Sequence, residues 1–175
     1  MWKITLALAL LLNGTLLHVN AQSKDTIKTT FQTSQEWRPT IDNRADAVMV
    51  YGVTGNPSDK KGSVPFEERV KSWRDRGYTV HYMTGIAWGE YQDYFTGKWD
   101  GKWHLDEGQV TQEGDTLWHG HLVPYLVPSD NFLTYLKEEH IKRVIDAGID
   151  QIFLEEPEFW ARGGYSDAFK REWQK

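Results

Sequence analysis

Three glutamates follow a short apolar run near the end of the sequence. The run at 152–154 predicts a buried strand; Glu155, Glu156 and Glu158 come directly after it, and Pro157 prevents the strand from continuing. Such a strand end places carboxyl groups at the edge of a sheet. Paired carboxyl groups suit glycoside hydrolysis, in which one acid protonates the leaving oxygen and another attacks or activates water. Because crowding raises the pKa of at least one carboxyl group, the segment predicts a general acid near neutral pH.

Only one of Glu155 and Glu156 is expected to point into the site, because neighbouring side chains of a strand alternate between its two sides. The structural alternative is that the remaining acids form ion pairs with the basic side chains that follow, which are Arg162, Lys170 and Arg171.

The segment Leu154-Glu155-Glu156-Pro157 resembles the Asn-Glu-Pro that ends strand four in the large retaining clan of (β/α)8-barrel glycoside hydrolases. The resemblance implies that Glu156 is the acid/base and that Pro157 matches the family's proline. Glu155 stands where the family has an asparagine that holds the sugar 2-hydroxyl; an acid there can accept the same hydrogen bond but changes the local charge. The family's nucleophile is a second glutamate near strand seven, which we do not expect within this chain.

Aromatic residues follow other predicted strand ends. Residues 84–91 come after the run at 78–83, which places Trp88 and Tyr91 on the same edge of the sheet as Glu156. A tryptophan in a glycine-flanked loop suits stacking on a sugar ring, the alternative being a ring packed beneath its own loop. We therefore predict a substrate-binding set made of Tyr51, Trp88, Tyr91, Glu158 and Trp160, beside the catalytic Glu155 and Glu156.

The histidines offer a weaker, metal-dependent alternative. His119 and His121 lie on one side of an extended segment, with His104, Asp106 and Glu107 on the ribbon before it. Imidazole and carboxylate groups suit zinc, but this spacing matches no tight metal-binding signature. The glycine-containing loops lack a phosphate-binding pattern, and no serine or cysteine nucleophile motif is present. We therefore predict no metal and no other cofactor.

The apolar patterns that position these residues alternate between strands and helices. They predict strands at 45–51, 78–83 and 151–154. Helices are predicted to begin at Pro65, at Ser129 or Asp130, and at Ser166. The second of these helices is expected to bury one face, made of Leu133, Leu136, Ile141, Val144 and Ile145.

This alternation of strands and helices predicts an α/β fold that is the front portion of a (β/α)8 barrel. Three strands precede the glutamates, one fewer than in the family, unless the N-terminal arm or an insertion supplies another. Residues 88–123 are predicted to be that insertion, with hairpins at Asp100-Gly101 and Glu113-Gly114. Since a complete barrel takes about 250 residues, we expect the barrel to be incomplete, truncated at its C-terminus and inactive as a 175-residue product.

The N-terminus predicts export. Residues 1–21 have the layout of a secretory signal peptide, 22–44 are predicted to be a polar N-terminal arm with little periodicity, and 45–175 are predicted to form the partial barrel. The chain has no cysteine, so it contains no disulfide. Its net charge of −5 argues against nucleic acid and against an anionic membrane surface as partners.

Together these patterns predict an exported, carbohydrate-active protein that hydrolyses the O-glycosidic bonds of an oligo- or polysaccharide when full length. Nine tryptophans and eight tyrosines agree with a binding cleft for sugar rings. The main alternative is a glycan-binding barrel module without catalysis.

Overall fold

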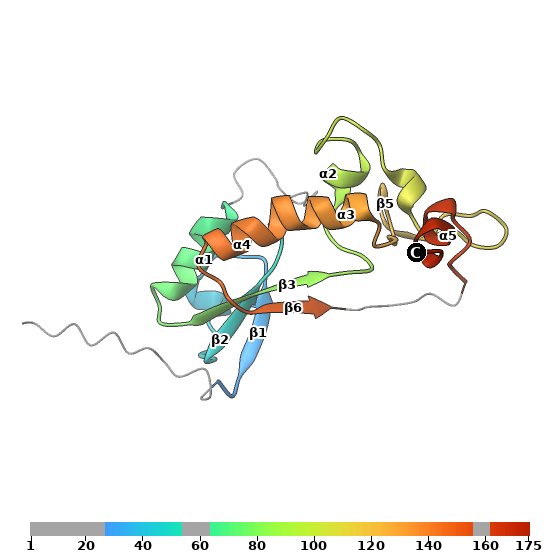
Figure 1. The fold of residues 1–175 in the computed structure, drawn as a ribbon. Helices are drawn as coiled ribbons and strands as arrows, with labels where there is room; N and C mark the ends of the chain where they lie inside the picture. Colours follow the sequence, from blue (N-terminus) through green and yellow to red (C-terminus); the bar gives the residue numbers. More distant parts are fainter. Residues whose placement is uncertain (1–26, 54–63, 156–161) are drawn as a thin grey trace, which may run out of the picture.

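A parallel four-stranded sheet organises the protein (Figure 1). The structure is a computed structural model that describes residues 27–53, 64–155 and 162–175; the predicted signal peptide lies outside them. The strands lie in the order β1-β2-β3-β6, all neighbours parallel. Their bounds are Thr30–Thr33 for β1, Ala47–Val50 for β2, Thr79–Gly85 for β3 and Ile152–Glu155 for β6. The three predicted strands and an α/β fold are thus confirmed, with small changes of bounds.

The strand β1 lies in the segment that we described as a polar arm, so this arm supplies the additional strand that the sequence left open. β1 pairs with β2 from Thr30↔Ala47 to Thr33↔Val50. Its one apolar side chain, Phe31, packs edge-on against the Trp73 ring, with the centroids 5.3 Å apart. A strand at the edge of a sheet needs only a few apolar residues, because one of its edges stays in water. The sequence segment therefore looks like a polar linker.

Helices cover one face of this sheet. The helix α1 (Phe66–Arg74) joins β2 to β3, and a longer helix made of α3, η4 and α4 joins β3 to β6. Figure 1 shows both helices on the same side of the strands. Every second strand residue meets them, and the main core on this face contains Val48, Val50, Phe66, Val70, Trp73, Val80, Tyr82, Val144 and Ile149.

The second helix is continuous but not uniform. It consists of α3 (Asp130–Tyr135), the π-helical segment η4 (Leu136–Ile141) and α4 (Lys142–Asp146). Its start was predicted correctly, since the Ser129 hydroxyl accepts a hydrogen bond from the Phe132 amide. Its buried face was predicted only in part, because Leu133 and Ile145 are 49% and 59% exposed.

The π segment explains the difference in that face. Phe132, Leu136, His140 and Val144 are all buried, a stripe with one residue in every four. In an ideal α-helix, residues twelve apart differ by about 120° around the axis. The one extra residue of a π turn offsets about 100° of this drift and so keeps the four side chains on one face.

The segment after β3, which we predicted to be an insertion and refer to by that name, is folded. It contains α2 (Gln92–Phe95), η3 (Leu105–Glu107) and the antiparallel strands β4 (Trp118–Gly120) and β5 (Val123–Pro124). No two-residue hairpin forms at Asp100-Gly101 in this described segment, because the Gly101 amide bonds back to the Gly97 carbonyl at 3.0 Å and leaves a wide loop. The turn predicted around Gly114 is present, with a bridge between Val110 and Thr116.

The insertion has its own small aromatic core around a buried carboxylate. The Glu107 side chain accepts hydrogen bonds from the Ser129 hydroxyl, from the Tyr94 hydroxyl at 2.5 Å and from the Asn131 amide at 2.8 Å. Burial raises the pKa of Glu107, but these hydrogen bonds outweigh it and leave that pKa below its ordinary value. Glu107 therefore holds the insertion against the start of α3.

Two further elements complete the described chain. The 3₁₀ turn η2 (Pro39–Ile41) precedes β2, and the helix α5 (Asp167–Trp173) begins at the predicted Ser166 cap. Within the part of the chain that the structure describes, we find no helix with the length and apolar character needed to cross a membrane.

Candidate functional site

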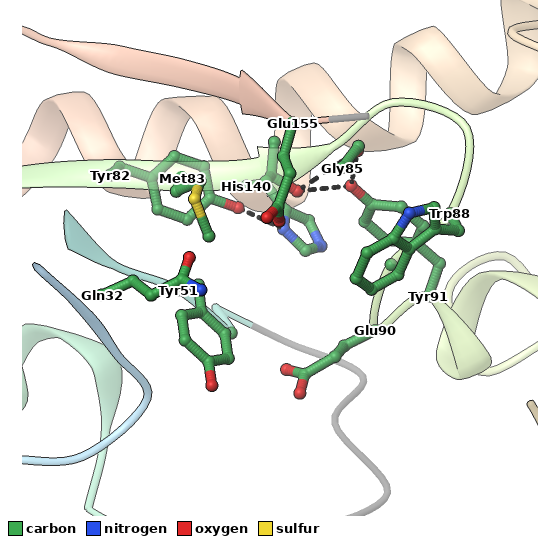
Figure 2. Close-up of a pocket in the computed structure, with 13 residues that line it drawn as sticks. Gln32, Tyr51, Tyr82, Met83, Gly85, Trp88, Glu90, Tyr91, His140 and Glu155 are labelled. Carbon is green, nitrogen blue, oxygen red and sulfur yellow. Dashed lines mark hydrogen bonds between the residues drawn. The ribbon is translucent and has the colours of Figure 1, made fainter. Parts of the chain in front are cut away.

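A cavity of about 260 Å³ lies at the carboxyl ends of the parallel strands (Figure 2). It is lined by Gln32, Tyr51, Gly52, Tyr82, Met83, Thr84, Gly85, Trp88, Gly89, Glu90, Tyr91, His140 and Glu155. Ligands of open parallel sheets bind at this edge, because the strands and their helices leave a crevice there. The volume lies just below the range typical of drug-sized ligands, about 300–1,000 Å³, and suits a group the size of a single ring.

Each strand of the sheet contributes to this lining. Gln32 belongs to β1, Tyr51 follows β2, Gly85 ends β3 and Glu155 ends β6. Gly85 and Glu155 are register partners on neighbouring strands, so the glutamate is held beside the start of the loop after β3. The backbone of the sheet thus positions the Glu155 carboxylate.

Four of the predicted site residues come together in the cavity. Tyr51, Trp88, Tyr91 and Glu155 all line it. The other three, Glu156, Glu158 and Trp160, lie outside the described residues.

The Trp88 loop returns closely over the end of β3. A Cβ atom added to Gly85 would lie 2.0 Å from the Trp88 carbonyl oxygen, so the position accepts only glycine without a shift of the backbone. The Trp88 ring stacks on the His119 ring with centroids 4.2 Å apart. One of the two histidines considered for a metal site therefore supports the tryptophan of the cavity.

Tyr91 is held within the protein more firmly than a purely ligand-binding residue needs to be. It is buried, and its hydroxyl oxygen lies 2.6 Å from the Gly85 carbonyl oxygen and 2.5 Å from Thr84 Oγ1. Burial raises the pKa of Tyr91 above its ordinary value, so the phenol stays protonated and donates. Tyr91 lines the cavity and also braces the Trp88 loop.

Sequence reasoning missed His140, which reaches the cavity from the π segment. Its Nδ1 atom lies 3.1 Å from the Tyr82 hydroxyl oxygen, and its Nε2 atom lies 2.9 Å from the Tyr135 hydroxyl oxygen. Tyr135 in turn donates to Asp93 at 2.7 Å. Burial lowers the pKa of His140 to about 3, and the positive charge of Arg143 adds to this shift. The histidine is therefore neutral at ordinary pH.

Sequence reasoning also missed Glu90. It follows Trp88 and Gly89 in the loop after β3, and Figure 2 shows its carboxylate and that of Glu155 reaching into the cavity from different sides. The available signal was its place in the sequence, directly before Tyr91 and two residues after Trp88, both of them predicted site residues. The cavity thus has two carboxylates from separate elements.

A buried arginine holds the rim that carries Tyr51. The Arg69 guanidinium donates to the carbonyl oxygens of Ser34 at 2.7 Å and Tyr51 at 2.9 Å, and to that of Gly52. Its Nε atom donates to the Val64 carbonyl at 3.1 Å. The Ser34 carbonyl follows β1 and those of Tyr51 and Gly52 follow β2, so one side chain of α1 joins the ends of two strands.

The described residues bring together no group of three or more histidine, aspartate or glutamate side chains that fits a metal ion. His104 stacks on the Tyr94 ring, with centroids 4.3 Å apart, and its Nε2 lies 3.1 Å from Asp100. His119 is engaged with Trp88 instead. His104 also lies 3.7 Å from Glu107, so the residues of the metal-dependent alternative form two separate sets of contacts, one around His104 and one around His119.

The cavity combines two carboxylates, aromatic side chains and a neutral histidine with two hydroxyl partners, groups that can orient a polyhydroxylated ligand and exchange protons with it. Comparison of the chain with protein-family models, with curated proteins and with solved structures finds no match.

Proposed function

We propose that the protein is a carbohydrate-active enzyme that hydrolyses O-glycosidic bonds of an oligo- or polysaccharide at this cavity. The observation that carries the proposal is the position of Glu155 at the end of β6, in one lining with Tyr51, Trp88 and Glu90. Carboxylates bind sugar hydroxyls and transfer protons, and aromatic rings cover the apolar faces of sugars.

The same proposal takes the four strands as the first four of a (β/α)8 barrel. Successive strands are neighbours, and both connecting helices lie on one face of the sheet (Figure 1), as in a barrel that winds in one direction. A doubly wound sheet has helices on both faces. The strand β6 supports this view, because Phe153 and Leu154 are 44% and 58% exposed on its two faces, where parallel strands are normally buried.

The strand count supports the family resemblance. With β1 included, β6 is the fourth parallel strand in chain order, and in the resembled family the Asn-Glu-Pro ends strand four. We propose that Glu155, in the asparagine position, contacts the substrate from the cavity. We propose that Glu156 is the acid/base, as the resemblance implies, and that Glu158 and Trp160 extend the substrate-binding surface.

Hydrolysis of unactivated oligosaccharides and of aryl glycosides tests this assignment in protein expressed from the native gene. A general acid contributes about 10²–10⁴-fold to the rate. We expect Glu156→Gln to lose that factor on unactivated substrates and far less on aryl glycosides, whose leaving group needs little protonation. Glu155→Gln is expected to raise KM more than it lowers kcat. The control is Glu113→Gln, at an exposed turn.

Two results would contradict the proposal in different ways. Equal loss on both substrate types for Glu156→Gln would remove the general-acid role. Binding of glycans without any cleavage by the wild type would favour the non-catalytic glycan-binding alternative.

We also propose export of the protein. Residues 1–21 are expected to be removed, so the mature chain isolated from the native host should begin at Gln22. Mass spectrometry of its N-terminal peptide distinguishes this from an uncleaved anchor.

A further inference from the structure

The hydrogen-bond chain beneath the cavity has a defined direction. It runs through Tyr82, His140, Tyr135 and Asp93, with separations of 3.1, 2.9 and 2.7 Å between successive polar atoms. The Asp93 carboxylate accepts the Tyr135 proton, so the Tyr135 oxygen can only accept from His140. His140 Nε2 must therefore carry the ring proton.

In the neutral imidazole, Nδ1 can then only accept a hydrogen bond. A neutral histidine has one donor nitrogen and one acceptor nitrogen, so His140 Nδ1 accepts the proton of the Tyr82 hydroxyl. The opposite tautomer would leave the single Tyr135 proton between two acceptors, His140 Nε2 and Asp93. Only one direction satisfies every member of the chain.

The consequence reaches the cavity through Tyr82. Its one proton is committed to His140, so only lone pairs of its oxygen remain for the Thr84 hydroxyl and for other partners. Tyr82 lines the cavity, and Figure 2 shows its hydroxyl end directed inward, toward His140. An isolated tyrosine can either donate to or accept from a ligand, whereas Tyr82 in this chain can only accept.

We propose that Tyr82 is a specificity-determining residue that accepts a hydrogen bond from a hydroxyl group of the bound sugar, and that His140 is the positioning residue that imposes this polarity. The inference rests on the proposed function. It assigns the ligand a donor hydroxyl at this point and disfavours sugars whose group there is deoxy, O-methylated or otherwise unable to donate.

The π segment supports a role of His140 in the site. Single π turns inside α-helices occur frequently at functional sites, and this one brings the histidine into the lining while Leu136 and Val144 stay in the core.

The first experiment measures binding to the full protein by isothermal titration. The probes are methyl glycosides of glucose, galactose, mannose and xylose, and then the monodeoxy and deoxyfluoro analogues of the tightest one. At one ring position, we expect deoxy and deoxyfluoro analogues to bind about 10-fold more weakly than the parent, because fluorine accepts but does not donate. Tyr82→Phe should weaken the parent by a similar factor and leave that deoxy analogue unchanged. Tyr165→Phe, at an exposed tyrosine outside the lining, is the matched control.

The second experiment determines the tautomer and the hydrogen bonding of His140 by NMR, without any ligand. Long-range ¹⁵N–¹H correlation of the histidine rings should show His140 as the Nε2–H tautomer with an Nδ1 that accepts a hydrogen bond. In Tyr82→Phe, the Nδ1 resonance should move toward that of an unbonded nitrogen while the tautomer stays the same.

The outcomes separate the inference from the proposed function. A deoxyfluoro analogue that binds as well as the parent, a Tyr82→Phe effect equal for parent and all deoxy analogues, or an Nδ1–H tautomer would overturn the inference and leave the carbohydrate site standing. If the wild type neither binds any of the four glycosides nor cleaves any glycan, both the proposed function and the inference are overturned.

Discussion

Acidification from pH 7 to pH 4.5 tests whether His140 is buried in its neutral form. Burial lowers the pKa of this imidazole to about 3 in the native protein, and an unfolded chain has a histidine pKa of about 6.5. Between these values the unfolded state binds a proton that the native state does not bind. The free energy of unfolding therefore falls as the pH falls, and this contribution is fully regained above about pH 6.5.

The size of the effect follows from the two pKa values. Each pH unit between them changes the free energy of unfolding by about 1.4 kcal/mol. From pH 6.5 to pH 4.5 the loss is on the order of 3 kcal/mol, which in a domain of this size lowers the Tm by roughly 5–10 °C. Carboxyl groups add to the loss only at lower pH. For example, a hydrogen bond from Tyr78 holds the pKa of Asp42 below its ordinary value, so the stability that it contributes is lost below this range.

A variant isolates the histidine from those groups. Urea denaturation at half-unit steps of pH should give a flatter profile for His140→Gln than for the wild type, because glutamine stays neutral and can still accept from Tyr82 and donate to Tyr135. His121→Gln, at an exposed histidine, should keep the wild-type slope. Equal slopes for wild type and His140→Gln would refute the reasoning. So would an NMR titration of His140 in the native protein with a midpoint near pH 6.5, a measurement that remains possible if the variant does not fold.

Three further predictions concern the residues around the cavity. Arg69→Met leaves four backbone carbonyls without their donor. We expect urea denaturation to show a loss of about 3–5 kcal/mol in the free energy of unfolding. The control, Lys71→Met on the exposed side of α1, should lose less than about 0.5 kcal/mol. Gly85→Ala places a Cβ atom 2.0 Å from the Trp88 carbonyl oxygen. We expect the free energy of unfolding to fall by about 2–4 kcal/mol and the tryptophan fluorescence to change. An unchanged spectrum and stability would contradict the close approach. Glu90→Gln is expected to lower kcat/KM for glycoside hydrolysis by at least about 10-fold with little change in stability, and Glu68→Gln on α1 should change neither.

Apolar runs made the central strands and the position of Glu155 predictable. A buried parallel strand needs several consecutive apolar residues, and 45–51, 78–83 and 151–154 have them. Because parallel strands end at one edge of a sheet, the aromatic residue after β2 and those after β3 were expected near the glutamate, and Tyr51, Trp88 and Tyr91 do line the same cavity.

Other parts of the site depend on features that leave little trace in sequence. β1 has one large apolar residue, since an edge strand can pair through its backbone alone. His140 reaches the cavity only because the helix is π-helical there, and an ideal α-helical pattern places the buried face elsewhere. The direction of a loop side chain such as Glu90 follows from the path of its loop, which packs so closely that the Tyr91 ring would lie 2.5 Å from a Cβ added to Gly89.

The π segment also sets which genetic changes the helix can tolerate. Many substitutions between Leu136 and Ile141 leave the backbone unchanged, but deletion of one codon there would favour an ordinary α-helix. The part of the helix before the deletion would then turn by about 100° relative to the part after it. Phe132 and Tyr135 would leave the insertion core, or Val144 would leave the sheet. The single extra residue therefore couples the spacing of two cores, and the length of this helix should vary less than its composition among any proteins that share the site.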